Sequence, residues 1–553
     1  MDYTKIPYFD DIFNDFIYNF DKIKQFFNGD YKNISDFHEV IYQKSNSYLQ
    51  NKQFDRNVIC DILKEQNKFF NSSQRTFDNI ELLRKDNTFT VTTGQQAGLA
   101  TGNIYTIYKA INTIQLADYL SVKFPQYNFV PLFWLEVDDH DFGEVNNINI
   151  LNKENELVNI KYHHYEPDVE KFLTPVFQID LNSKIQIFID ELKSNIVKTD
   201  FSDEITDYVE RSYKPGINYV TAFARFFNYL LNDKGLIFCN AAEKEFKQLL
   251  IPIFLKELNT FPQSCEIVID TSEKLERHYE PQVKPRAINM FFNNNSSRYL
   301  IEPSSEIQFG LKNSRKKFEK SELFEILESN PELFSANVIL RPVCQDYLFP
   351  TVCYVGGPSE VAYFAQLKKV YEYFFVTMPI IFPRTSASLI ENKVTSFFTK
   401  YNLNFEDFID FQNLKLKLLE QLDTVNVENL FTKYKDEIRG LEYSMEKELI
   451  KVDKNLIAAF KGRNDKYIET IDTIKAKFIE SQIKQNDTAM SKLKSVSDMI
   501  FPVGNLQERY FNIINYLNKY SLKLIDFLFE QLKIGKFEHQ LIDLNFKSIE
   551  SKE

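Results

Sequence analysis

Over the first 86 residues, apolar side chains recur every three or four positions, as in FDDIFNDFIYNFDKIKQFF and FDRNVICDILKEQNKFF. This spacing predicts helices with one apolar face. The pattern changes at residue 87: TFTVTT is β-rich, a helical run follows over residues 104–114, and residues 129–137 form an apolar run. A strand, a helix and a second buried strand in this order are typical of a βαβ unit with a parallel sheet.

The same alternation returns further along the chain. The predicted strands are GLIFCN, ANVILRP, PTVCYVGG and MPIIFPR, and a helix is predicted over residues 359–374. Two stretches, near 151–215 and 265–335, interrupt the alternation, and we interpret them as insertions. We therefore predict an α/β core with a parallel sheet over residues 87–395, to which residues 1–86 add helices.

Residues 396–500 contain no strand pattern, and their apolar positions follow a longer repeat. Several of them recur every 11 residues: Tyr434, Met445, Leu456, Tyr467 and Phe478. An 11-residue repeat predicts long helices that stay nearly straight or supercoil slightly to the right. Either the polar stretch 453–455 or the stretch 462–465 would turn one helix back on the other, as an antiparallel coiled coil. FPVG ends the pattern, and residues 501–553 are expected to form terminal helices.

One helical hairpin covers only part of this apolar stripe. Large exposed apolar surfaces usually mark an interface, and two-fold pairing is the commonest assembly of a single repeated chain. We therefore expect a homodimer formed through residues ~400–500, with a separate active site on each core domain.

Composition and charge narrow the class of protein. The 553 residues carry 66 Lys and Arg against 78 Asp and Glu, a formal net charge of −12, which argues against nucleic acid or an anionic membrane as the main partner. No apolar run reaches the ~18 residues of a membrane span, and no signal segment is visible. The five Cys are scattered without a CxxC pair, which favours reduced thiols in the cytoplasm.

The strongest candidate site is TTGQQAGLATG, residues 92–102, between the first predicted strand and its helix. It holds three of the chain's 14 Gly. Glycine lets a backbone approach a ligand closely, and a helix N-terminus offers free N–H groups to an anion. The segment matches neither GxGxxG nor GxxxxGK[ST], so it specifies no known nucleotide motif. An ordinary strand-to-helix turn is the alternative.

A second candidate follows the strand at residues 129–137. Asp138, Asp139, His140 and Asp141 lie at its carboxyl end, where open α/β sheets bind ligands. Three carboxylates and an imidazole can bind a divalent metal or supply a general base. The alternative is a cluster that caps and hydrogen-bonds the chain.

Several cations could bind an anion. YEPQVKPRAIN, residues 279–289, is basic and stiffened by proline, and Arg341 and Arg384 lie at the ends of predicted strands. Gly356, Gly357 and Glu360 belong to a further strand-to-helix turn. The alternatives are a structured surface loop, salt bridges and a helix cap.

Six segments occur in one order and together resemble the BshC family of bacillithiol biosynthesis. They are TTGQQAGLATGNIYTIYKAI, VPLFWLEVDDHDFGEVNNI, YEPQVKPRAINMFF, RPVCQDYLFPTVCYVGGPSEVAYFAQL, IIFPRTSASLIE and FPVGNLQERYFNIINYLNKY. The resemblance covers essentially the whole chain. This chain departs from the family at Glu136-Val137-Asp138, where relatives tend to have a small residue, Gly and Glu.

The resemblance implies a Rossmann-like core with connecting-peptide insertions, a C-terminal coiled coil that forms a dimer, and a ligase. The ligase would add L-cysteine to glucosaminyl malate in the last step of bacillithiol biosynthesis, through an activated malyl carboxylate. ATP or a similar nucleotide is expected to provide the activation, and Mg²⁺ is a candidate cofactor. The resemblance also implies a core similar to class I nucleotidyltransferases and synthetases. In that analogy residues 94–102 take the place of the HxGH loop and residues 384–386 that of the KMSKS loop, although this chain contains neither motif.

We accordingly expect catalytic roles for Asp139, His140, Asp141 and Arg384. The residues expected to bind nucleotide or substrate are Thr93, Gly94, Gln95, Gln96, Gly98, Thr101, Gly102, Trp134, Gln282, Arg286, Asn289, Arg341, Gln345, Gly356, Gly357, Glu360 and Ser386. Two alternatives come from other classes: a metal-dependent hydrolase that uses residues 138–141, and a non-catalytic coiled-coil scaffold.

Overall fold

The computed structural model describes residues 1–51, 55–165, 174–422, 427–453 and 456–544. The chain forms two compact units, which are described in turn. Met1–Ser388 and Leu506–Ile542 make up the core unit, and Leu389–Asn505 make up most of the second unit.

A five-stranded parallel sheet lies at the centre of the core unit. Its strands are β1 (Thr88–Gln96), β2 (Asn128–Glu136), β5 (Ile237–Cys239), β11 (Thr351–Gly356) and β12 (Ile380–Pro383), in the spatial order β12-β11-β1-β2-β5. This is the strand order of dinucleotide-binding folds, in which the order reverses beside the first strand. The predicted Rossmann-like α/β core is therefore confirmed.

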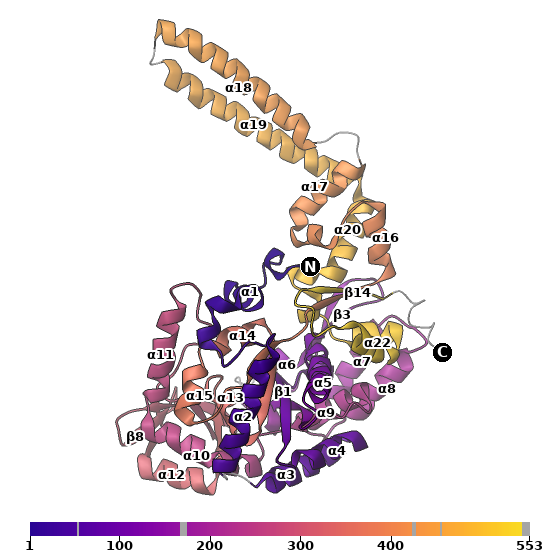
Figure 1. Ribbon diagram of the computed structural model, residues 1–553. Coiled ribbons are helices and arrows are strands. Elements are labelled where there is room, and N and C mark those ends of the chain that lie inside the picture. The colour runs from indigo at the N-terminus through magenta and orange to yellow at the C-terminus, as the bar shows by residue number, and fades with distance from the viewer. Residues whose placement is uncertain (52–54, 166–173, 423–426, 454–455, 545–553) are drawn as a thin grey trace. The chain divides into compact units, whose positions relative to one another are not determined.

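Helices cover the sheet (Figure 1). The first of them are α1 (Asp11–Tyr18), α2 (Ile34–Asn51), α3 (Arg56–Phe69), α4 (Gln74–Leu83) and α5 (Tyr105–Lys123). Most consecutive positions of β1 and β2 are buried, which requires cover on both faces of these strands. The helix α5 connects β1 to β2 and packs on both, as the sequence predicts for a βαβ unit.

The stretches interpreted as insertions have structure of their own. The first contains the hairpin of β3 (Asn147–Leu151) and β4 (Leu157–Lys161), then α7 (Ile185–Asn195) and α8 (Ser202–Ser212). The second contains most of an antiparallel sheet, which is completed by β10 (Phe334–Ala336). Its other strands are β6 (Met290–Asn294), β7 (Ser297–Pro303), β8 (Gln308–Leu311) and β9 (Lys317–Glu319).

The remaining elements of the core unit connect these sheets. They are α6 (Phe142–Val145), α9 (Tyr219–Leu231), α10 (Lys244–Thr260), α11 (Gln263–Leu275), α12 (Lys320–Ser329), α13 (Leu340–Leu348), α14 (Pro358–Phe364), α15 (Lys368–Phe374), α21 (Ile514–Tyr520) and α22 (Lys523–Gln531). The C-terminal segment also forms β14 (Gln540–Asp543), which pairs with β13 (Ala387–Ile390). Helices alone were expected there, and residues 545–553 lie outside the described residues.

The predicted strand at ANVILRP is wrong, because Arg341 lies in α13. Asn337 accepts hydrogen bonds from the N–H groups of Ile339 and Leu340 and so stabilises the start of this helix. Pro342 follows in the first turn, where a helix tolerates proline. An apolar run of this length does not by itself distinguish a strand from a buried helix.

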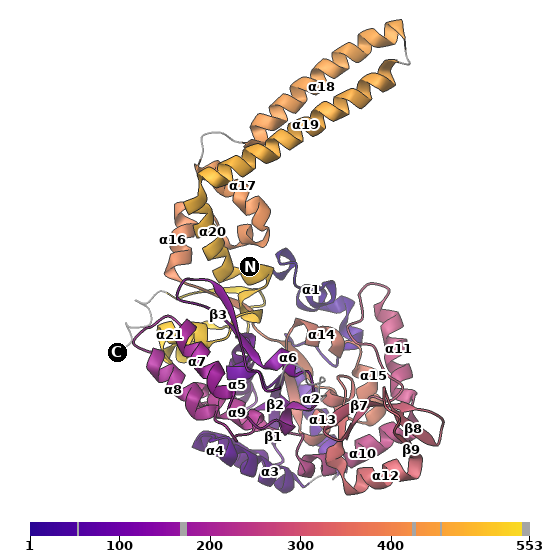
Figure 2. The same cartoon turned by 180° about the vertical axis from the view of Figure 1, so that it is seen from behind.

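The second unit is helical, as predicted. Its helices are α16 (Asn392–Lys400), α17 (Phe411–Leu422), α18 (Val427–Val452), α19 (Leu456–Gln485) and α20 (Asp487–Ile500). In Figures 1 and 2, α18 and α19 lie side by side as an antiparallel hairpin. The chain reverses between Val452 and Leu456, and residues 454–455 of this turn lie outside the described residues. The alternative turn at 462–465 is wrong, because those residues lie within α19.

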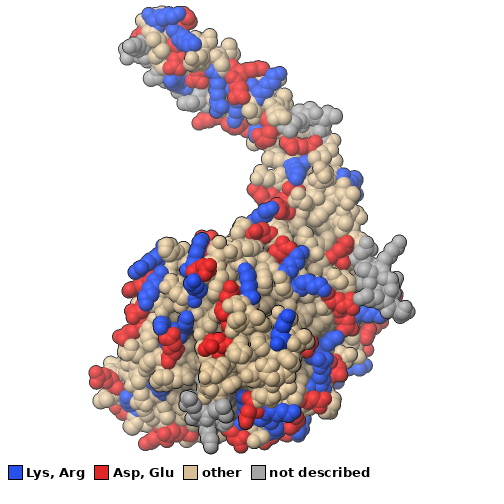
Figure 3. Space-filling model, viewed as in Figure 1, with Lys and Arg blue, Asp and Glu red and all other residues tan. Residues whose placement is uncertain are grey.

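The charges of the described surface are mixed. On the face drawn in Figure 3, Lys and Arg side chains are interspersed with Asp and Glu, so neither sign dominates it. Among the described residues, none of the helices is both long enough and apolar enough to cross a membrane.

Candidate active site

Two adjoining cavities open where the strands of the central sheet end. The larger, of about 530 Å³, lies beyond the carboxyl ends of β2 and β5, and we call it the large pocket. The smaller, of about 230 Å³, lies beyond β1, β2 and β11, and we call it the switch-point pocket because the strand order reverses beside β1. Glu136, Val338 and Arg341 line both. Open α/β sheets bind their ligands at this edge.

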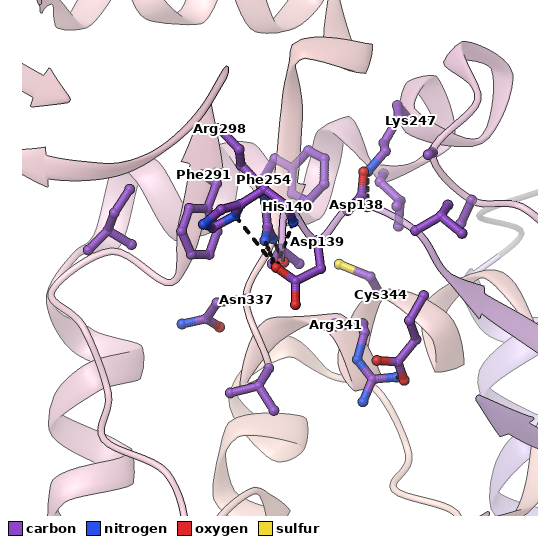
Figure 4. Close-up of a pocket in the computed structure, with 18 of the residues that line it drawn as sticks. Asp138, Asp139, His140, Lys247, Phe254, Phe291, Arg298, Asn337, Arg341 and Cys344 are labelled. Carbon is purple, nitrogen blue, oxygen red and sulfur yellow. Dashed lines mark hydrogen bonds and ion pairs between the residues drawn. The ribbon is translucent and has the colours of Figure 1, made fainter. Parts of the chain in front are cut away.

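The acidic loop after β2 forms one wall of the large pocket, and its carboxylates contact different cations. Lys247 Nζ of α10 donates to Asp138 Oδ2 at 2.7 Å, whereas Asp139 Oδ1 lies 3.4 Å from Arg298 Nη1 of β7. Figure 4 shows Asp138 directed toward Lys247 and Asp139 beside Arg298. Among the described residues, no group of three or more His, Cys, Asp or Glu is placed to hold a metal ion.

His140 of this loop is suited to accept a proton. Its Nδ1 lies 3.5 Å from Asp139 Oδ1 and is buried without a hydrogen bond to any described residue. Partial burial lowers the pKa of the imidazole below its ordinary value of 6.5, although the negative charge of Asp139 opposes the shift. His140 is therefore mostly neutral at pH 7, the state that a general base requires.

The large pocket is also lined by cations that have no close carboxylate partner. Lys284 and Arg286 lie on the segment between α11 and β6, and neither side chain makes a hydrogen bond or ion pair to a described residue. Lys312 also lines the pocket, at 4.0 Å from Glu302. This excess of positive charge suits a ligand with more than one carboxylate, since Arg and Lys bind such groups.

A buried ion pair organises the switch-point pocket. Lys109 of α5 is paired with Glu360 of α14, and its Nζ donates to the Gly94 carbonyl at 2.7 Å. Glu360 also accepts hydrogen bonds of 2.7 Å from Tyr354 Oη and from the Gly357 N–H. Burial acts to raise the pKa of Glu360, but Lys109 and these hydrogen bonds outweigh it and hold the pKa below its usual value. The pair therefore fixes the end of β1 against α14.

A second ion pair stands between the two pockets. Arg341 Nη1 lies 2.5 Å from Glu136 Oε1, and Arg341 Nη2 donates to Tyr363 Oη at 2.6 Å. Burial raises the pKa of Glu136, and the charge of Arg341 opposes the shift. A ligand that spans both pockets would pass this pair, because both residues line each cavity.

Arg384 lines the switch-point pocket and is held by a residue far along the chain. Its Nη2 donates to Oε1 of the fully buried Glu508 at 2.7 Å. Glu508 also accepts from Ser386 Oγ at 3.0 Å and from the Ala387 N–H at 2.8 Å. Ser386 is therefore an internal partner of Glu508 and lies on neither pocket wall.

The glycine loop is packed against the protein itself. Gly94, Gln95 and Gln96 belong to β1, so the loop starts later than the sequence indicates. A Cβ at Gly98 would lie 2.7 Å from the Cα of Gly102, whose φ is +69°. The close approach that these two glycines allow is therefore between two parts of the loop, where we expected a ligand.

We predict that Gly98→Ala destabilises the core unit by about 1–3 kcal/mol, the usual cost of overpacking. The added methyl group would meet backbone atoms, which cannot move aside cheaply. Urea unfolding followed by circular dichroism measures the change. Gly535→Ala is the matched control, because its Cβ meets no atom within 4 Å. Equal unfolding midpoints for the two variants would contradict this interpretation of the loop.

The structure brings part of the expected set to the two pockets. The expected residues on their walls are Gln95, Gln96, Trp134, Asp139, His140, Arg286, Arg341, Gly357, Glu360 and Arg384. The expected residues that line neither pocket are Thr93, Gly94, Gly98, Thr101, Gly102, Asp141, Gln282, Asn289, Gln345, Gly356 and Ser386.

Several of the residues outside the pockets have structural partners. Thr93 Oγ1 donates to the Val355 carbonyl at 2.8 Å, which joins β1 to β11. Asn289 Nδ2 donates to Ser264 Oγ at 2.9 Å in a buried network. Gln282 Nε2 donates to Asp10 Oδ2 at 3.3 Å, away from both cavities.

Comparison with known proteins gives one consistent family. The family model described as "Bacillithiol biosynthesis BshC, N-terminal Rossmann-like domain" matches residues 1–385. The model described as "Bacillithiol biosynthesis BshC, C-terminal coiled-coil domain" matches residues 387–544. The change from one match to the next falls close to Ser388, where the chain leaves the core unit.

Curated relatives match over nearly the whole chain. A protein of Salinibacter ruber is 34% identical over 97% of this chain and 96% of its own length. A protein of Chlorobaculum tepidum is 34% identical over 93% of this chain and 92% of its own length. A protein of Bacillus cytotoxicus is 29% identical over 90% of this chain and 92% of its own length. All three carry the name "Putative cysteine ligase BshC".

Proposed function

Since the chain belongs to the BshC family of bacillithiol biosynthesis, we propose that it is a ligase that joins L-cysteine to glucosaminyl malate through an amide bond. The single observation that carries this proposal is the large pocket, which is lined both by unpaired cations and by a half-buried, neutral histidine. The reaction is placed in the cytoplasm, where the five free cysteines would stay reduced.

The large pocket is assigned to glucosaminyl malate. The malyl group carries carboxylates, and the two cations Lys284 and Arg286 are free to bind them. His140, which lines the same pocket, would accept the proton that the attacking amine loses as the amide bond forms. The recognition of the anionic end and the proton transfer would then occur in one cavity.

The direction of amide formation has two chemically possible forms, because each substrate contains an amine and a carboxylate. Either an activated malyl carboxylate is attacked by the amine of cysteine, or an activated cysteine carboxylate is attacked by the amine of the sugar. Lys284 and Arg286 favour the second form, since they would hold the malyl carboxylates as free anions. Fragmentation of the product by mass spectrometry shows whether cysteine is linked to the malyl carboxylate or to the amine of the sugar, and so distinguishes the two forms.

The switch-point pocket is assigned to a nucleotide. A free carboxylate is a poor electrophile, and ATP or a similar nucleotide, with Mg²⁺ as a candidate partner, would supply its activation. The activating phosphate or nucleoside phosphate would leave with one carboxylate oxygen as the amide bond forms. Gln95 and Gln96 at the end of β1 would orient the bound group, and Lys109 would hold that strand end in place. Four cations and two carboxylates line the pocket, and the excess of positive charge fits an anionic group.

Thiol profiling after deletion of the gene tests the proposed function. We expect glucosaminyl malate to accumulate and bacillithiol to disappear, and the purified protein to form the ligated product from cysteine, glucosaminyl malate and ATP. An unchanged thiol profile together with no product in the reconstituted reaction would contradict the proposal. Full activity after metal chelation would separately exclude the hydrolase alternative.

We also propose that two copies of the chain pair through the hairpin of α18 and α19. Large apolar side chains stay exposed along it, among them Leu441 (67% exposed) and Met445 (51% exposed). The same apolar surface of a second copy could cover these side chains, since exposed apolar surface of this kind usually marks an interface.

We predict that Leu441→Lys with Met445→Lys converts a wild-type dimer into a monomer, because the charges would be buried unpaired in the dimer. Light scattering at micromolar concentration measures the mass, and circular dichroism checks that the core remains folded. Thr432→Lys, which replaces an exposed polar residue on the side of α18 away from Leu441, should leave the dimer intact. A wild-type protein of 65.4 kDa in solution would refute the proposed pairing.

A further inference from the structure

The segment that follows the coiled coil completes the wall of the switch-point pocket. The chain leaves the core unit after Ser388 and returns at Leu506, and Arg509 then lines this pocket. The motif NLQERYFN, which contains Arg509, resembles the family, but the roles proposed above do not use it.

The backbone on both sides of Arg509 is held by buried polar groups. Glu508 on one side contacts Arg384 and two further donors of residues 386–387. Asn512 on the other side donates from Nδ2 to the carbonyls of Ala100 at 2.8 Å and Gly102 at 2.7 Å. The Arg509 carbonyl itself accepts from Asn103 Nδ2 at 2.8 Å. Arg509 is therefore carried on a fixed stretch of chain, although its side chain is exposed.

Among the described cations that line this pocket, Arg509 is the one without a carboxylate partner. Of the cations on its walls, Lys109 is paired with Glu360, Arg341 with Glu136, and Arg384 with Glu508. The Arg509 side chain, by contrast, makes no hydrogen bond or ion pair to a residue that the structure describes.

Arg509 and Tyr105 line the same pocket, and the charge of Arg509 acts on the Tyr105 hydroxyl. Burial raises the pKa of the Tyr105 hydroxyl, and the charges of Arg384 and Arg509 oppose this shift. Tyr105 lies at the start of α5 and lines the same pocket. An anion in the pocket would thus meet three guanidinium groups, of which Arg341 and Arg384 are already paired with carboxylates.

We propose that Arg509 binds the phosphate groups of the nucleotide in the switch-point pocket, and that the segment Leu506–Asn512 belongs to the binding site because it positions Arg509. This inference rests on the proposed function for the presence of a nucleotide. A guanidinium is suited to the role because its planar donors match phosphate oxygens in pairs. The volume of about 230 Å³ suits a phosphate chain better than a whole nucleotide.

Calorimetric titration of the full chain with ATP, and separately with inorganic pyrophosphate, tests the inference. We expect Arg509→Gln to weaken the binding of both probes at least tenfold and Arg509→Lys to weaken it less, because lysine keeps the charge but loses the paired donors. Arg315→Gln is the matched control: Arg315 is exposed and lies on neither pocket wall, so binding should not change. Circular dichroism confirms that each variant is folded.

Wild-type affinity for ATP and pyrophosphate in a folded Arg509→Gln protein would overturn the inference. A wild-type chain that ligates its substrates but binds neither probe would also overturn it, while leaving the ligase activity in place. Binding of ATP that depends on Arg509, in a protein that forms no ligated product, would instead support the inference and contradict the proposed function.

Discussion

Replacing Glu508 with alanine is expected to lower the free energy of unfolding of the core unit by about 3–5 kcal/mol, the usual cost of removing one partner of a buried ion pair. Glu508 is fully buried and is the carboxylate that pairs with Arg384, whose guanidinium is also buried. Without it, Arg384 would keep a positive charge in the interior with no carboxylate beside it. Urea unfolding followed by circular dichroism measures the change.

Two further variants make this result specific to the ion pair. Glu508→Gln keeps the shape of the side chain and should give an intermediate loss of stability, because an amide oxygen can still accept the hydrogen bond from Arg384. Glu273→Ala removes an exposed carboxylate from α11 and should change stability by no more than about 0.5 kcal/mol. If Glu508→Ala unfolds at the same urea concentration as Glu273→Ala, the pair does not stabilise the core.

The second large effect concerns catalysis. We expect His140→Ala to reduce the rate of product formation by ~10²-fold or more, the usual scale for loss of a general acid or base. His140 lines the large pocket and is only half-buried, so the folded structure should be nearly unaffected. Single-turnover rates with saturating substrates measure the effect. His163→Ala is the control, because His163 is exposed just after the end of β4 and lines neither pocket.

The pH dependence of the rate follows from the same residue. The pKa of His140 is lowered from 6.5, so the neutral imidazole predominates at pH 7 and the rate should fall only as the pH drops below 6.5. Asp139→Asn removes a negative charge that opposes this lowering, so the acidic limb of the profile should move to still lower pH. If the acidic limb of the Asp139→Asn profile lies at the same pH as that of the wild type, another group controls the rate.

The first elements of the central sheet could be predicted because each of them has a recognisable pattern in its own stretch of sequence. An apolar strand, a helix with one buried face and a second apolar strand specify β1, α5 and β2 within some 50 residues, and each element needs only its own pattern to be recognised. The acidic loop was found for the same reason: Asp139 and His140 directly follow a buried strand, and strand ends of a parallel sheet meet at one edge.

Sequence patterns were less informative where long-range contacts decide a residue's role. Nothing near Ser386 indicates that it binds Glu508, which lies 122 residues away. Asn289 stands in a basic segment, but the fold turns it inward to Ser264, whereas Arg286 of the same segment lines the large pocket. A one-dimensional pattern identifies such segments without showing which of their side chains face the ligand.

Lys109, Lys247 and Arg298 line the pockets but were not predicted from the sequence, although the two lysines leave a weak trace in its pattern. Lys109 interrupts the apolar run IYTIYKAI, and a lysine on the buried face of a helix needs a partner or a function. Lys247 stands likewise in a helix, α10, whose other buried residues are mostly apolar. Arg298 lies in a strand, with a stacking contact of 3.8 Å to the Phe291 ring that no local motif indicates.

The interruption of the core by the coiled-coil unit also sets the order in which a ribosome can complete the protein. Arg384 and Glu508 are separated by 124 residues, which take about 6–25 s to synthesise at ~5–20 residues per second. Throughout that interval a nascent core has its arginine but not the carboxylate that neutralises it. The intervening hairpin consists of local helix contacts that form in microseconds to milliseconds, so it can fold before the rest of the core has been synthesised. The part of the core unit that carries the switch-point pocket would therefore be among the last parts of the molecule to assemble.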